Sequence, residues 1–198
     1  MFKNLIELTK VRIGFLVLTT TIIGFYLGAQ GKIDNMLLLF TVIGTLLSST
    51  GSSVMNNVIE SESDKLMDRT KNRVLPTKKI SLNFAKFLGI SFIIVGLLIL
   101  YFKVNFLTCM LSLLTIILYL FLYTPLKRKS WLNTSVGAIP GAIPPLGGWT
   151  AATNSLEWGG IAVFLILFFW QHPHFYSIAY MLSLYTHLRA HETLPYLV

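Results

Sequence analysis

Two adjacent stretches decide the fold: FAKFLGISFIIVGLLILYF (84–102) and VNFLTCMLSLLTIILYLFLY (104–123). Each is close to the roughly 20 residues that a helix needs to cross about 30 Å of hydrocarbon in a bilayer. Between them they carry one charged side chain, Lys86. A helix on the surface of a soluble protein has a polar side, whereas these stretches are apolar all round. They therefore predict membrane-spanning helices.

Four further stretches have the same character, so the chain is predicted to cross the membrane six times. The composition agrees, because 54% of the 198 residues are hydrophobic and only 12% are charged, against about 25% charged in an average soluble chain. We therefore expect an all-α fold, a polytopic transmembrane helical bundle. The four other predicted spans cover residues 13–30, 36–58, 134–152 and 159–182.

Basic residues are distributed unevenly among the predicted loops, and such residues concentrate in loops that stay in the cytoplasm. With the N-terminus inside, only Lys32 and Lys103 fall on the outer side. We expect a multi-pass protein of the cell (inner) membrane with a cytoplasmic N-terminus. The net charge of +8 then reflects topology and argues against nucleic-acid binding. The inner side holds Lys3, Lys10, Arg12, Lys65, Arg69, Lys71, Arg73, Lys78, Lys79, Lys86, Lys127, Arg128, Lys129 and Arg189.

Two smaller features concern processing and redox chemistry. No small-residue cleavage site follows the first apolar run, so the first span is expected to be retained rather than removed as a signal peptide. Cys109 is the single cysteine, so no intramolecular disulfide can form, and we expect it to pack within the fourth span.

Acidic residues gather in one stretch, NNVIESESDKLMDRTKNR (56–73). If the second helix continues past the membrane surface, a polar residue recurs every four positions, with each step rising about 6 Å and turning only about 40° around the axis. The first three members then share a face, whereas Glu62 falls on the other side of the helix. The four residues at this spacing are Asn56, Glu60, Asp64 and Asp68.

Carboxylates on one helix face repel each other, and a divalent cation would offset that repulsion. Magnesium is usually held by one or two carboxylates while water and substrate phosphates complete its octahedron. Arg69, Lys71 and Arg73 follow directly and suit a bound diphosphate. The alternative is a solvated loop whose acids pair locally with Lys65 and Arg69.

Two later stretches also stand out. In VGAIPGAIPPLGGW (136–149), three prolines free backbone carbonyls, while small residues permit close approach of another helix or a flat ligand. The alternative is a kinked packing helix. In WQHPHF (170–175), Gln171, His172 and His174 lie within an apolar span, where polar groups need a partner or a cavity. Imidazole is also a common haem and metal ligand, although a buried histidine is often simply hydrogen-bonded.

These motifs together resemble the protohaem IX farnesyltransferases, also called haem O synthases, of the UbiA-type membrane prenyltransferase family. The resemblance runs from LIELTKVRIGFLVLTT through the acidic motif and RTKNRVLP to YTPLKRKSWLNTSVGAIPGAIPPLGGW and WQHPHF, about residues 5 to 181. It implies a single transmembrane prenyltransferase-like domain over 1–198, with about six of the family's roughly nine spans. The implied reaction transfers a farnesyl group from farnesyl diphosphate to a vinyl group of haem B, which gives haem O.

The resemblance also implies roles for individual residues. Asn56, Glu60 and Asp64 fall on the catalytic motif that binds Mg²⁺, the implied cofactor, with Asp68 as a further metal ligand. The implied partners are farnesyl diphosphate and haem B as substrates, within the lipid bilayer, while the oligomeric state is not indicated. The residues implied to bind substrate are Arg69, Lys71, Arg73, Lys127, Arg128 and His174. From the placement of WQHPHF, we expect His174, or alternatively His172, to contact the haem or its iron.

Two departures from the family pattern bear on activity. Glu60 replaces the usual aspartate, which keeps the charge and adds a methylene. The family also carries a second aspartate-bearing motif after the sixth helix, where this chain reads MLSLYTHLRAHETLPYLV, with Glu192 as its single acid. We therefore expect a chain that lacks the C-terminal helices and one wall of the diphosphate site.

Two other functions fit parts of the pattern. An aromatic-ring prenyltransferase of the quinone type would share the acidic motif but not the proline-rich and WQHPHF stretches. A small transporter, or a truncated non-catalytic membrane protein, would fit the interrupted helix, because transport substrates often bind beside such helices. A transporter would more often place its carboxylates at the middle of the bilayer.

Overall fold

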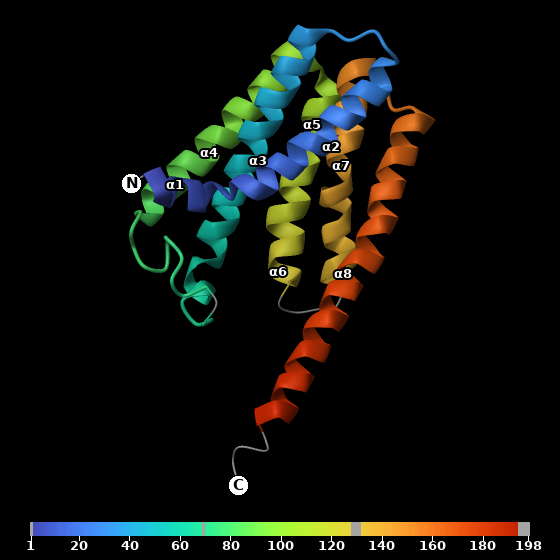
Figure 1. Cartoon of the computed structure of the whole chain (residues 1–198). Helices are drawn as coiled ribbons and strands as arrows, with labels where there is room; N and C mark the ends of the chain where they lie inside the picture. The colour runs from blue at the N-terminus through green and yellow to red at the C-terminus, as the bar shows by residue number, and fades with distance from the viewer. Residues whose placement is uncertain (1, 69, 128–131, 194–198) are drawn as a thin grey trace.

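The computed structural model describes residues 2–68, 70–127 and 132–193, and every regular element in these ranges is helical. Figure 1 shows a bundle of long helices from which the C-terminal part of α8 projects. The predicted all-α class is confirmed. The elements are α1 (Phe2–Thr9), α2 (Val11–Ala29), α3 (Asn35–Asp64), α4 (Leu82–Ile99), η1 (Leu100–Val104), α5 (Phe106–Ile117), η2 (Leu118–Tyr123), α6 (Thr124–Leu126), α7 (Asn133–Thr153) and α8 (Trp158–Thr193), with η marking π-helical segments.

Five membrane-spanning candidates occur in the described part of the chain, at Val11–Ala29, Asn35–Asp64, Leu82–Val104, Phe106–Leu126 and Trp158–Met181. They correspond to five of the six predicted spans. The remaining prediction, 134–152, is a 21-residue helix, α7, that is not apolar enough to count among the five. Its glycines and prolines lower its hydropathy. α7 packs against α2, α5 and α8, and much of its surface is buried in these contacts.

Helix starts follow local capping chemistry. Asp34 caps α3 by accepting hydrogen bonds from the backbone N–H groups of Met36 and Leu37, at 2.9 and 3.1 Å. Ser81 caps α4 and Asn105 caps α5 in the same way. These side chains satisfy N–H groups that have no partner within the first helical turn. These capping side chains therefore fix where the three helices begin.

Small residues allow the closest helix contacts. A Cβ on Gly148 of α7 would lie 1.9 Å from the carbonyl oxygen of Thr21 on α2, and a Cβ on Gly24 would lie 1.9 Å from that of Pro145. Only glycine permits backbones to approach this closely, as in many membrane helix pairs. Of the two expectations for the glycine-rich stretch, close approach of another helix is confirmed, whereas close approach of a flat ligand stays a prediction. Its three prolines are accommodated inside a continuous α7.

A small apolar core fixes the end of the bundle where α3 finishes. It joins Leu8 of α1, Val54 and Val58 of α3, Leu75 of the following loop and Ala85 of α4. Asn57 reinforces this contact, because its Nδ2 donates to the carbonyl oxygen of Leu8 at 2.9 Å. α1 and the loop are thereby held against α3. Cys109, in the first turn of α5, is buried, as expected for a packing residue.

Candidate functional site

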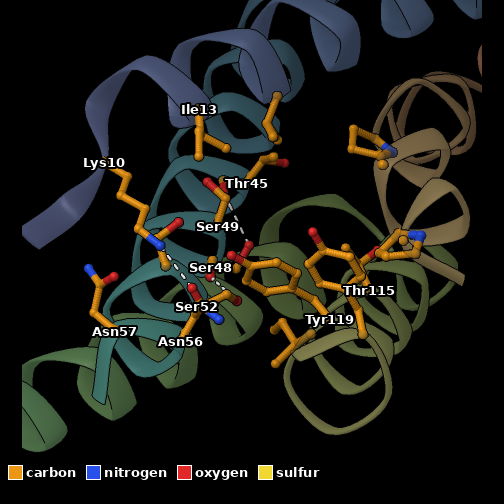
Figure 2. A pocket seen from close by; sticks show the side chains of 18 of the residues that line it. Lys10, Ile13, Thr45, Ser48, Ser49, Ser52, Asn56, Asn57, Thr115 and Tyr119 are labelled. Atoms are coloured by element: carbon orange, nitrogen blue, oxygen red, sulfur yellow. Dashed lines mark hydrogen bonds between the residues drawn. The ribbon is translucent and has the colours of Figure 1, made fainter. Parts of the chain in front are cut away.

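A cavity of about 660 Å³ lies among α2, α3, α5 and α7. Its charged side chains gather where α3 ends, and its other walls carry hydroxyl and apolar groups. Figure 2 shows Lys10 reaching toward Asn56 on α3, with Ser48, Ser49 and Ser52 along the same helix. The cavity thus has a charged end and a long, largely uncharged body.

The predicted acidic face lies at that charged end, where Asn56 and Asp64 line the cavity. Asn56, Glu60 and Asp64 lie on successive turns of α3, and their exposed fractions are 3%, 5% and 4%. The prediction that these three residues share a face is confirmed. Two carboxylates this deeply buried need partners, because an isolated buried charge is strongly unfavourable.

Each member of the face has a cationic partner from a different part of the chain. Lys10 Nζ, at the junction of α1 and α2, donates to Asn56 Oδ1 at 2.8 Å. Lys127 Nζ, after α6, lies 3.3 Å from Glu60 Oε1. Arg73 Nη1, in the loop after α3, lies 2.9 Å from Asp64 Oδ2. Three cations therefore converge on one end of the cavity.

Asn56 is also oriented from its other side. Its Nδ2 donates to Thr124 Oγ1 at 3.0 Å, and that hydroxyl donates to the carbonyl oxygen of Tyr119 at 2.7 Å. The last bond spans the π-helical segment η2, and such segments are frequent at functional sites. With its nitrogen engaged, Asn56 points its oxygen at Lys10.

Lys10 was missed as a site residue, because the sequence showed it only as one of many basic residues on the inner side. Its backbone has a φ of 50°, in the left-handed region, where α1 turns into α2. Burial lowers the pKa of Lys10 to about 8, and the nearby Glu60 carboxylate opposes that shift. Lys10 therefore stays largely protonated at neutral pH. Its position directly before the first span, on the same side as the acidic motif, was the available signal.

Other predicted site residues lie elsewhere. α3 ends at Asp64, so Asp68 is in the loop, where its side chain is 97% exposed and pairs with Lys71 at 2.6 Å. The helix therefore ends one turn before Asp68. Asp68 and Lys71 do not join the buried face of Asn56, Glu60 and Asp64. Glu62 is 80% exposed and pairs with Lys65, as the local-pairing alternative predicted. Arg69 and Arg128 lie outside the described residues.

The side-chain oxygens of the acidic face have the chemistry of magnesium ligands. Within residues 2–68, 70–127 and 132–193, no group of three or more His, Cys, Asp and Glu side chains is placed to hold a metal. Glu60 and Asp64 with the amide oxygen of Asn56 supply two carboxylates and a neutral oxygen, the hard donors that Mg²⁺ prefers. The Lys10 ammonium on the Asn56 oxygen shows that this face accepts a cation. The residues fit an ion that also needs water or phosphate oxygens.

Beyond the charged end, the cavity walls combine aromatic, hydroxyl-bearing and aliphatic side chains. Tyr119 and Tyr123 stack with ring centroids 5.8 Å apart, and both line the cavity. Ser48 on α3 accepts a hydrogen bond from Ser112 on α5 at 3.1 Å. Aliphatic side chains such as Ile13, Val17 and Leu111 complete the lining. This body suits an apolar chain whose anionic head sits at the charged end.

The WQHPHF stretch divides between two faces of α8. Gln171 Nε2 donates to the carbonyl oxygen of Ala138 on α7 at 3.2 Å, and His172 Nε2 lies 3.1 Å from Ser135 Oγ. These two residues attach α8 to α7. His174 is exposed and stacks on Trp170, with ring centroids 4.6 Å apart. Phe175 lines the cavity.

The model of the UbiA prenyltransferase family matches residues 17–188, and the chain belongs to this family. Among curated relatives, the protoheme IX farnesyltransferase of Solibacter usitatus is 43% identical over 188 residues, which cover 90% of this chain and 64% of that protein. The protein of the same name from Aquifex aeolicus is 42% identical over 178 residues, with 89% and 61% covered. The chain thus spans less than two thirds of these relatives.

Two solved structures share the fold. One, described as concerning digeranylgeranylglyceryl phosphate synthase in membranes, has a TM-score of 0.75 at 21% identity and covers 84% of this chain and 58% of its own. The other, a UbiA homologue from Archaeoglobus fulgidus bound to DMAPP and Mg²⁺, has a TM-score of 0.67 at 18% identity, with 84% and 59% covered. The chain is a multi-pass membrane protein of this fold.

Proposed function

We propose that this protein acts in the transfer of a farnesyl group from farnesyl diphosphate to a vinyl group of haem B, giving haem O. The observation that carries the proposal is the convergence of Lys10, Arg73 and Lys127 on the buried acidic face, at one end of a largely apolar cavity. Anionic diphosphate suits the cations, and a prenyl chain suits the cavity body. The names of the relatives supply the acceptor.

Farnesyl transfer begins with departure of diphosphate, which leaves an allylic cation. Bound Mg²⁺, held by Asn56, Glu60 and Asp64, would neutralise charge on the departing diphosphate. Arg73 and Lys127 stabilise the same developing charge, because fixed donors inside a cavity act without reorganising. The exposed Asp68 stands apart from this group, and we assign it no metal contact.

The cavity body protects the cation from premature capture by water, since its walls are mostly apolar and aromatic. Electrons of the haem vinyl group then attack the farnesyl carbon, which moves the positive charge to the haem side chain. Water adds to that carbon, and loss of a proton leaves the hydroxyl of the product. We assign His174 to the haem side of the reaction because its ring stands exposed on α8, whereas His172 is engaged with Ser135 on α7.

We further propose that the chain forms a single prenyltransferase-like domain of the cell (inner) membrane with its N-terminus in the cytoplasm. The charged end of the cavity lies where α3 and α6 end, the side on which the loops carry most of the basic residues. The diphosphate would then enter from the cytoplasm, while the prenyl chain extends into the bilayer.

The test is to incubate the purified protein in detergent with Mg²⁺, haem B and farnesyl diphosphate, and to detect haem O by mass spectrometry. A full-length relative run in parallel shows that the assay works. Haem O formation supports the proposal, and its absence beside an active relative contradicts it for this chain. A parallel reaction with an aromatic acceptor in place of haem B separates the haem substrate from a quinone-type one.

A further inference from the structure

We propose that Lys10 is a diphosphate-binding residue that pairs with the Asn56 oxygen when no metal uses that oxygen, and that transfers to the diphosphate when magnesium binds there. This inference rests on the proposed function only in taking a metal–diphosphate group as the ligand. Lys10 lies outside the acidic stretch and its basic continuation (56–73), 46 residues before Asn56. In this scheme the acidic face always carries a cation, first the ammonium and then the metal.

The contact between Lys10 and Asn56 carries the first step. Lys10 Nζ lies 2.8 Å from Asn56 Oδ1, and the Asn56 nitrogen is engaged by Thr124 at 3.0 Å, which fixes the direction of the oxygen. A metal ion that uses this oxygen would stand close to the ammonium. Like charges at such a distance repel, and the low dielectric of a buried site strengthens the repulsion. Magnesium binding therefore expels Lys10 from Asn56.

The surroundings determine where the ammonium goes. Arg73 and Lys127 line the same cavity and already pair with Asp64 and Glu60. A displaced Lys10 side chain near these two cations needs an anion. A diphosphate between the three cations meets that need, and an ammonium can donate three hydrogen bonds to its oxygens.

The movement requires only the side chain. The backbone before Lys10 is held by the Asn57 to Leu8 hydrogen bond of 2.9 Å and by burial of Leu8, which is 2% exposed. The left-handed backbone of Lys10 itself directs the side chain into the cavity from the α1–α2 junction (Figure 2). Lys10 thus has an anchored backbone, and its ammonium group can change partner by rotation of the side chain alone.

The experiment compares two binding measurements on the full chain in detergent, by titration calorimetry. The first follows Mg²⁺ alone, and the second follows inorganic pyrophosphate in the presence of saturating Mg²⁺. The variants are Lys10→Met, which removes the ammonium, and Lys10→Arg, which restores a cation. The control is Lys65→Met, because Lys65 pairs with the 80% exposed Glu62 away from the cavity.

The expected changes have opposite signs. Lys10→Met should tighten Mg²⁺ binding several-fold, since a competing cation is gone, and weaken pyrophosphate binding by about tenfold to a hundredfold, since a charged hydrogen bond is lost. Lys10→Arg should recover most of the pyrophosphate affinity, and Lys65→Met should change neither. A merely structural role for Lys10 would weaken both ligands together and would overturn the proposal.

A third Lys10 variant guards against misfolding. Lys10→Gln keeps a donor for Asn56 without the charge, and its folding is checked by the thermal unfolding of the metal-free protein. Unchanged pyrophosphate affinity in a folded Lys10→Gln or Lys10→Met protein would also overturn the proposal. Pyrophosphate carries neither a prenyl chain nor haem, so this assay gives its answer whether or not haem O is formed.

Discussion

Arg73 closes the loop after α3 back onto the last residue of that helix, with its Nη1 2.9 Å from Asp64 Oδ2. Thr70 Oγ1 adds a bond of 3.1 Å to the Asp64 carbonyl oxygen. The Asp64 side chain is buried, while that of Arg73 remains one third exposed, at 34%. One ion pair therefore places a buried carboxylate and a partly exposed guanidinium at the same end of the cavity, as the proposed metal and diphosphate site requires.

Asp64→Asn is expected to abolish any farnesyl transfer. The change removes a charged metal donor and leaves Arg73 without its counter-charge, so the loss should be at least about a hundredfold, beyond that typical for indirect metal contacts. Haem O formation and Mg²⁺ affinity are the measurements. Glu62→Gln removes one carboxylate from the exposed side of α3 and serves as the control. Activity near the unmutated rate in Asp64→Asn would remove this residue from the metal site.

Thr124→Val is expected to weaken Mg²⁺ binding about tenfold without unfolding the protein. The hydroxyl accepts from Asn56, so its loss frees the amide to rotate its oxygen away from the metal position. Thr124→Ser keeps the hydroxyl and should restore the affinity. Calorimetric titration with Mg²⁺ checks both variants, and failure of serine to restore binding would show that the methyl group, rather than the hydrogen bond, matters.

Gly148→Ala is expected to destabilise the bundle by about 1–3 kcal/mol, the usual range for overpacking. Its Cβ would meet the Thr21 carbonyl oxygen at 1.9 Å, so α2 and α7 must move apart. The neighbouring Gly147→Ala is a matched control, because nothing lies within 4 Å of its added Cβ. Thermal unfolding in detergent, followed by circular dichroism, measures the difference. Equal unfolding temperatures for the two variants would contradict the close contact.

His172→Ala and His174→Ala should separate packing from haem binding. His172 bridges α8 to Ser135 on α7 at 3.1 Å, so its loss should lower the unfolding temperature. His174 is exposed, so its loss should leave the unfolding temperature unchanged and weaken haem binding, seen as a smaller change in the Soret absorption. Unchanged haem binding in His174→Ala would exclude the proposed contact.

Much of this molecule follows from local patterns. Runs of apolar residues long enough to cross a bilayer predicted the spans, because hydrocarbon cannot satisfy backbone polar groups and a helix satisfies them internally. The spacing of Asn56, Glu60 and Asp64 predicted one buried face, because helical periodicity alone sets it. The same rule failed at Asp68, since α3 ends at Asp64 and the spacing then carries no meaning.

The sequence by itself determined that the protein is a helical membrane protein with an acidic face at one helix end. Only the tertiary structure decided what that face meets. Lys10 lies 46 residues from Asn56, and Thr124 lies 68 residues from it. Such contacts depend on how helices pack, and here glycine contacts such as Gly148 on Thr21 set the helix positions. Local periodicity fixes the direction of a side chain, but only packing selects its partner.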